Sequence, residues 1–189
     1  MDNASSLPYL IGSRVAERRA TLDISLTELE GRTGVSRAMI SRIERGEVHA
    51  SAVLLDKLCA GLGLSLSALF AREDSSPLLR RADQPVWQDP YSRYIRREVA
   101  PGGTGSAVRI VEVEFPAGAE VSYDRSRHRV IAQHVWMLDG EMEITVAGVA
   151  HNLSAGDCMF MRLTDRNSFR NLSGKPARYA VILTLEPAA

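Results

Sequence analysis

The sequence has little cysteine and no excess of charge of either sign. Its two cysteines, Cys59 and Cys158, lack a CxxC partner, so we expect neither a cysteine zinc site nor a disulfide. Both should be buried as small apolar residues. The formal net charge is zero, so no overall electrostatic field attracts the protein to nucleic acid. Any DNA binding therefore has to come from a local positive patch.

Long apolar runs are also missing. We find no stretch of about 18 apolar residues and no N-terminal apolar run with a basic flank, so we expect a cytoplasmic protein without a membrane partner. Hydrophobic content of 45% and charged content of 24% are typical of a folded globular chain. The length of 189 residues allows one large domain or two small ones.

The most informative stretch is residues 34–46, GVSRAMISRIERG. Gly34 suits a tight turn and Ser36 a helix N-cap, and Ile40 and Ile43 then share an apolar helix face. The other side carries small and basic residues: Arg37, Ala38, Ser41, Arg42 and Arg45. Such a helix suits a DNA major groove, because small residues permit close approach and arginine can fork onto guanine or phosphate. The alternative is an ordinary solvated surface helix.

The flanking sequence predicts four more short helices. Ser25 with Glu28 three residues later is a capping-box pattern, and Ser51 is placed as another N-cap. We expect these helices at residues 9–20, 26–32, 52–62 and in a last turn ending at 69–70. Helix, tight glycine turn, helix is the helix-turn-helix arrangement, so the flanks favour the DNA-binding interpretation.

Residues 9–70 closely resemble the xenobiotic-response-element (XRE) helix-turn-helix family, whose relatives include phage repressors and Cro. The resemblance rests on these residues: Leu29, Gly34, Val35, Ser36, Ile40, Ile43, Glu44, Gly46, Leu55, Leu58, Leu62, Leu69 and Phe70. One position departs from the family pattern. Glu30 stands four residues before the turn glycine, where a small residue is usual at the helix crossing. We expect Glu30 either to rotate the preceding helix slightly or to place its carboxylate at the rim of the helix crossing.

The resemblance also implies roles for individual residues. Arg37, Ala38 and Ser41, which follow the N-cap Ser36, would meet bases. Arg42 and Arg45 would contact phosphates, and Thr27 would hydrogen-bond a phosphate from the start of the preceding helix. One such helix makes too few contacts for a specific site. We therefore expect a homodimer on double-stranded DNA with a palindromic operator.

Positive charge is concentrated near the helix within residues 34–46, which we call the recognition helix. Residues 1–75 contain nine Arg or Lys against ten Asp or Glu, a net charge of −1. Between Arg32 and Arg45, however, four arginines accompany only Glu44. We expect Glu44 to form a structural ion pair, because a carboxylate repels phosphate, and Arg18 and Arg19 to lie on a solvated face.

The second half of the chain has a different residue pattern. After a domain at residues 1–71, residues 72–92 read as a linker that becomes the first edge of a second domain at 93–189, with Trp87 docked on that domain. Period-two runs then predict about nine short strands, typical of a β-sandwich or barrel. They are residues 94–99, 108–115, 120–123, 130–138, 141–146, 149–153, 158–161, 168–171 and 178–185. The predicted fold class is thus α + β with two domains, a five-helix bundle followed by a barrel.

The barrel sequence resembles the double-stranded β-helix, or jelly roll, of the cupins. Six scaffold positions of that pattern are kept: Pro116, Gly118, Gly140, Gly156, Asp157 and Asn171. The four positions that hold metal in cupins fall on Ser126, His128, Gln133 and Asn167. Neutral amides and a hydroxyl cannot hold a transition metal tightly, so we expect no metal and no cofactor. Strand alternation turns the neighbouring His134 to the other face.

Without metal, the barrel interior could still bind a small-molecule effector. Tyr123, Ser126, His128, Gln133 and Asn167 would line such a site, or would satisfy one another in a filled core. We therefore predict a transcriptional regulator and not an enzyme. The alternatives are a metal-dependent cupin oxidoreductase with an accessory helix-turn-helix domain, as in the epoxidase that makes fosfomycin, and a DNA-binding module whose cupin serves only dimerisation.

Overall fold

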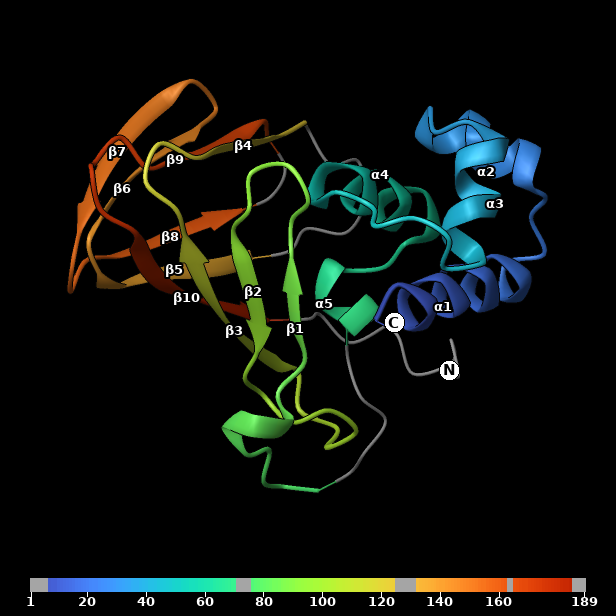
Figure 1. Cartoon of the computed structure of the whole chain (residues 1–189), viewed down its shortest axis with the longest axis horizontal. Coiled ribbons are helices and arrows are strands. Elements are labelled where there is room, and N and C mark those ends of the chain that lie inside the picture. Colours follow the sequence, from blue (N-terminus) through green and yellow to red (C-terminus); the bar gives the residue numbers. More distant parts are fainter. Residues whose placement is uncertain (1–6, 71–75, 125–131, 163–164, 185–189) are drawn as a thin grey trace. The chain divides into compact units, whose positions relative to one another are not determined.

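The computed structural model describes residues 7–70, 76–124, 132–162 and 165–184. The chain divides into two compact units, Met1–Phe70 and Ala71–Ala189. The first unit is helical and the second is built from antiparallel sheets (Figure 1). The predicted two-domain α + β class is confirmed.

The helical unit contains the five predicted helices. They are α1 (Leu7–Thr21), α2 (Leu26–Thr33), α3 (Arg37–Glu44), α4 (Ala52–Leu62) and α5 (Leu66–Phe70). The predicted capping box is present, because Ser25 Oγ accepts from the Glu28 N–H and the Glu28 carboxylate accepts from the Ser25 N–H. The hydrogen bond from the Ser25 backbone N–H to the carboxylate is the largest cause that lowers the pKa of Glu28. Ser36 and Ser51 cap α3 and α4 as predicted.

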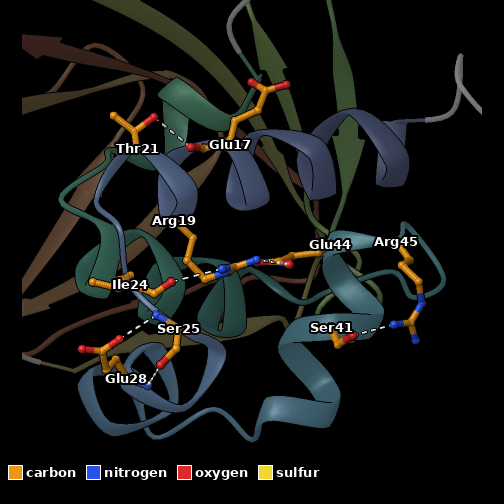
Figure 2. Close-up of polar contacts among 9 residues, drawn as sticks. All are labelled: Glu17, Arg19, Thr21, Ile24, Ser25, Glu28, Ser41, Glu44 and Arg45. Carbon is orange, nitrogen blue, oxygen red and sulfur yellow. Dashed lines mark hydrogen bonds and ion pairs between the residues drawn. The ribbon is translucent and has the colours of Figure 1, made fainter.

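An ion pair joins α1 to α3 inside the helical unit (Figure 2). Arg19 Nε lies 2.7 Å from Glu44 Oε1, and another Arg19 nitrogen donates to the Ile24 carbonyl at 3.0 Å. The hydrogen bond to Glu44 raises the pKa of Arg19. The structural role of Glu44 is therefore confirmed, whereas the solvated face for Arg18 and Arg19 is wrong. Arg18 instead donates to the carbonyl of Leu62, one of the acceptors that the end of α4 leaves unpaired.

The helices α1 and α3 pack closely at Gly12. A Cβ atom at this position would collide with the carbonyl oxygen of Ile43 and lie 2.8 Å from that of Glu44. The apolar side chains of α3, Ile40 and Ile43, are buried at 0% and 2% exposure. Only glycine permits this approach, and the sequence pattern alone did not identify it.

The second unit contains two sheets with antiparallel pairing (Figure 1). One has the order β1-β2-β3-β10-β5-β8 and the other β4-β9-β6-β7. Their strands are β1 (Val86–Gln88), β2 (Ile95–Glu98), β3 (Val108–Phe115), β4 (Glu120–Tyr123), β5 (Ala132–Asp139), β6 (Glu141–Val146), β7 (Val149–Ser154), β8 (Cys158–Arg162), β9 (Asn167–Arg170) and β10 (Ala177–Thr184). The 3₁₀ helix η2 (Arg81–Asp83) precedes β1. Among the described residues the nine predicted strands are present with ends that differ by one or two residues, and the short β1 is an addition; residues 130, 131 and 185 of the predicted strands lie outside the described residues.

Strand alternation fixes which side chains enter the space between the sheets. Along β5, Val135 and Met137 are buried at 0% and 1% exposure, whereas His134 and Trp136 are exposed. Trp87 is buried and packs edge-on against Tyr94, as predicted for its docking. The predicted burial of Cys158 is wrong, because its position on β8 faces outward; Cys59 is buried as expected.

Candidate DNA-binding surface and barrel interior

The turn between α2 and α3 positions the recognition helix. Gly34 adopts a left-handed conformation with φ of 68°, and its N–H bonds to the Glu30 carbonyl at 2.8 Å. Ser36 Oγ then accepts from the Met39 N–H at 3.3 Å, which starts α3. With Ile40 and Ile43 buried, the opposite face of α3 points to solvent.

The predicted DNA-binding residues lie on the outside of this motif. Arg37, Ala38, Arg42 and Arg45 are exposed on or next to α3, and Ser41 is half-buried between them. Two further residues, Ser36 at the N-cap and Thr27 in the first turn of α2, are also exposed. All seven side chains can therefore reach a partner without disturbing the core.

Glu30 contacts Arg37, the first residue of the recognition helix α3. Its Oε1 accepts from the backbone N–H of Arg37 at 3.2 Å, and its Oε2 lies 3.3 Å from Arg37 Nε. The carboxylate of Glu30 thus lies at the rim of the helix crossing, which is one of the two outcomes expected from the sequence. There it meets the arginine expected to read bases.

Glu47 holds the arginines at the other end of the helix. Its carboxylate oxygens lie 2.5 Å and 3.1 Å from two nitrogens of Arg45, and 3.9 Å separates it from Arg42 Nε. The hydrogen bond from Arg45 is the largest cause that lowers the pKa of Glu47, and the same bond raises the pKa of Arg45. Another nitrogen of Arg45 donates to Ser41 Oγ at 2.5 Å (Figure 2).

These contacts change the charge balance read from the sequence. Glu44, the acid within residues 32–45, is turned to Arg19 and does not reach the outer face. Glu30 and Glu47, which flank that window, instead accompany the three outer arginines. The recognition face carries three positive and two negative groups, so its attraction to phosphate is weaker than the sequence count implies. The pair of Glu30 and Arg37 forms across a turn, and Glu47 meets its arginines from beyond the end of α3. The spacing of residues along one helix does not predict such contacts.

In the second unit, part of the predicted polar set lies in the interior. Gln133 on β5 and Asn167 on β9 are buried at 6% and 4% exposure. Asn167 Nδ2 donates to the Asp165 carbonyl at 3.2 Å, while its buried Oδ1 has no partner among the described residues. Tyr123 lies opposite Asn167 in the β4–β9 pairing, and its hydroxyl is 3.2 Å from that of Tyr94. Ser126 and His128 lie outside the described residues.

A buried ion pair on β2 was not predicted from the sequence. Arg96 and Glu98 are 8% and 6% exposed, and Arg96 Nε lies 3.0 Å from Glu98 Oε1. Burial raises the pKa of Glu98, although the charge of Arg96 and its hydrogen bond oppose that rise. Burial also raises the pKa of the nearby Tyr179. The available signal was the i, i+2 spacing of opposite charges, which puts both on one face of a strand.

Two of the four positions that hold metal in cupins, Gln133 and Asn167, lie within the described residues. Across the described parts of the chain, no group of three or more His, Cys, Asp or Glu side chains could hold a metal ion. Gln133 and Asn167 offer neutral amides where a divalent transition metal needs imidazole or carboxylate ligands. Among the same residues, no helix combines the length and apolar character required to cross a lipid bilayer.

The helix-turn-helix with its outward arginines and the jelly-roll unit define a DNA-binding protein with a cupin domain. The family model "Helix-turn-helix" (HTH_3) matches residues 15–69, and "Cupin domain" (Cupin_2) matches residues 111–183. The chain belongs to the XRE-type (HTH_3) helix-turn-helix transcriptional regulators and carries a C-terminal cupin domain.

Two curated relatives are transcriptional regulators. The HTH-type transcriptional regulator SutR of Escherichia coli K12 is 22% identical over 166 residues, 88% of this chain and 89% of SutR. The uncharacterized HTH-type transcriptional regulator y4dJ of Sinorhizobium fredii NGR234 is 32% identical over 68 residues, 36% of this chain and 88% of y4dJ. The first similarity spans both units and the second covers a length close to that of the helical unit.

Solved structures show the same fold. An HTH_3 family transcriptional regulator from Vibrio cholerae superposes with a TM-score of 0.77 at 21% identity, over 95% of this chain and 97% of that one. FeII HppE has a TM-score of 0.50 at 14% identity, over 94% of this chain and all of that one. At such identities the likeness concerns the fold alone.

Proposed function

We propose that the protein is a dimeric, sequence-specific regulator that binds a palindromic operator in the cytoplasm. The observation that carries the proposal is the outer face of α3, where Arg37, Arg42 and Arg45 are exposed over a buried apolar side. Arg37, with Ala38 and Ser41, reads bases in the major groove. Arg42, Arg45 and Thr27 hold phosphates, and Ser36 starts the helix beside them.

A homodimer is part of this proposal because one recognition helix reads only a half-site. The outward face of the larger sheet supports it. Ile110, Ile182, His134 and Phe160 are register neighbours across β3, β10, β5 and β8, and Trp136 lies two residues along β5 from His134. Trp136 and Phe160 are 48% and 51% exposed, an apolar exposure more typical of a protein interface than of a solvated surface.

The cupin domain is proposed to sense a small-molecule effector without metal. Buried Gln133, and Asn167 with an Oδ1 that has no partner among the described residues, support a polar ligand in the interior, to which Tyr123, Ser126 and His128 would contribute. An effector changes operator affinity only if the two dimer arrangements bind it unequally. We do not propose the metal-dependent oxidoreductase, because the neutral amides at positions 133 and 167 do not suit its metal.

The DNA assignment is tested with two arginine variants of the full chain. Binding-site selection from a random duplex library defines the preferred sequence, and affinities are then measured for that duplex and for a scrambled one. Arg37→Ala should lose discrimination between the two, by about 1–3 kcal/mol at one base pair of each half-site. Arg42→Ala should weaken binding to both duplexes alike and reduce the salt slope by about 1. If both variants bound the selected duplex like the wild type, the assignment of the recognition helix would be wrong.

A further inference from the structure

We propose that Glu30 is a specificity-determining positioning residue that holds Arg37 for base reading and turns it away from phosphate. This inference rests on the proposed DNA-binding function. Glu30 belongs to α2, yet both of its carboxylate oxygens engage Arg37, one at the backbone N–H and one at Nε. No other part of the recognition helix receives such a double contact from the preceding helix among the described residues.

The ion pair of Glu30 and Arg37 adds little to the stability of the unit. The side chains of Arg37 and Glu30 are 63% and 39% exposed, and ion pairs at that exposure contribute little to folding. The interior pair of Arg19 and Glu44, at 22% and 12%, already joins α1 to α3. The effect of Glu30 therefore has to be sought in binding.

The contact with Glu30 bears on how the guanidinium of Arg37 can bind a base. Glu30 Oε2 lies 3.3 Å from Arg37 Nε, and the guanidinium has a second edge, formed by its two terminal nitrogens. That edge can fork onto O6 and N7 of guanine. An arginine held in one orientation loses less side-chain entropy on binding than a mobile one, so the contact prepares Arg37 for the base.

The charge of Glu30 also discriminates between DNA groups. A carboxylate next to the first N–H of α3 repels a phosphate that would otherwise be attracted to a helix N-terminus and an arginine. It tolerates a base edge, which carries no net charge. At the other end of the helix, Glu47 alone accompanies both Arg42 and Arg45, which leaves an excess of positive charge for phosphate.

The test compares Glu30→Ala and Glu30→Gln in the full chain, with and without Arg37→Ala. The probes are the duplex selected by the wild type, its single-base variants and a scrambled duplex, titrated by fluorescence anisotropy at several salt concentrations. Glu17→Ala, on the exposed side of α1, removes the same charge away from the recognition helix and serves as the control.

We expect Glu30→Ala to reduce discrimination at the base pair read by Arg37 by about two- to tenfold, a coupling typical of residues in direct contact. Non-specific binding should strengthen and its salt slope should steepen by up to about 1, because Arg37 becomes available to phosphate. Glu30→Gln, which keeps an acceptor for the Arg37 N–H, should retain part of the discrimination. In the Arg37→Ala background, Glu30→Ala should leave the remaining base preferences unchanged.

The possible results distinguish a failure of the role of Glu30 from a failure of the proposed function. Unchanged discrimination in Glu30→Ala, or the same loss with and without Arg37, would overturn the role of Glu30 alone. If Arg37→Ala keeps full discrimination at every position, the base-reading assignment fails first. If the wild-type protein selected no sequence from the library, the proposed function itself would be wrong.

Discussion

The two units of the chain place their polar groups in opposite ways. In the helical unit the described buried residues are apolar apart from Ser67, the pair of Arg19 and Glu44 is half-buried, and charge is displayed on the outer face of α3. In the barrel unit Arg96 and Glu98 are buried, whereas Trp136 and Phe160 are exposed. The helical unit is thus arranged to meet a charged partner with its surface. The barrel unit instead buries charged side chains in a mostly apolar interior and exposes aromatic ones.

The tight interior of the helical unit predicts the largest effect. Gly12→Ala should destabilise this unit by about 3 kcal/mol, because the new methyl group would collide with backbone carbonyls of α3 that cannot move independently. Thermal unfolding of the full chain measures the loss, which should leave the transition of the barrel unit in place.

Gly31 provides a matched control for Gly12. A Cβ atom at Gly31 would meet no heavy atom of the described residues within 4 Å, and this residue lies inside α2. Gly31→Ala should therefore stabilise the helix by about 0.5–1 kcal/mol. Similar stability changes in the two variants would show that the interior of the helical unit is looser than its geometry implies.

The outer face of the barrel predicts the next effect. Trp136→Ser should raise the dissociation constant of the dimer about 30-fold, the ~2 kcal/mol of an aromatic residue central to an interface. Sedimentation velocity over a concentration series measures this, with Val149→Ser as control, since Val149 is 57% exposed on the other sheet. A dimer of unchanged strength would mean that the exposed aromatic face does not join two copies.

Acid should change the contributions of Glu98 and Glu28 to stability in opposite directions. The raised pKa of Glu98 means that the folded barrel binds its proton more readily, so this residue contributes stability below the unfolded pKa that is lost as pH rises through the folded value. The lowered pKa of Glu28 has the opposite consequence, with stability present above the unfolded pKa and lost as pH falls through the folded one.

Two glutamine variants separate these contributions. Glu98→Gln should remove a stabilising response to acidification between neutral pH and the ordinary glutamate pKa near 4.3. Glu28→Gln should remove a destabilising response of the helical unit at lower pH. Denaturant unfolding of both variants and the wild type across this range reports the slopes. Equal slopes in Glu98→Gln and wild type would contradict the cost assigned to burying this carboxylate.

The same difference explains what could be predicted from the sequence. The helices, the caps at Ser25, Ser36 and Ser51, and the outward arginines follow from local spacing, so they were predicted correctly. The pairs made by Glu30 and Glu47 depend on how a turn brings separate segments together, and spacing along one helix does not reveal them. Arg96 and Glu98 were missed because buried charge runs against the alternation that identifies strands. The roles of Ser126 and His128 stay predictions.

The smallest expected effect concerns the phosphate-binding end of α3. Glu47→Gln should strengthen binding to scrambled DNA by about two- to fivefold near 0.1 M salt and steepen the salt slope by up to about 1, because Arg45 and Arg42 no longer share a carboxylate. Discrimination between bases should stay as in the wild type, unlike in Glu30→Ala. Glu17→Gln controls for the general loss of one negative charge. If Glu47→Gln instead lost discrimination at the base pair read by Arg37, the division of α3 into a base-reading end and a phosphate-binding end would be wrong, since the contacts of Glu47 lead to Arg42, to Arg45 and, through Arg45, to Ser41.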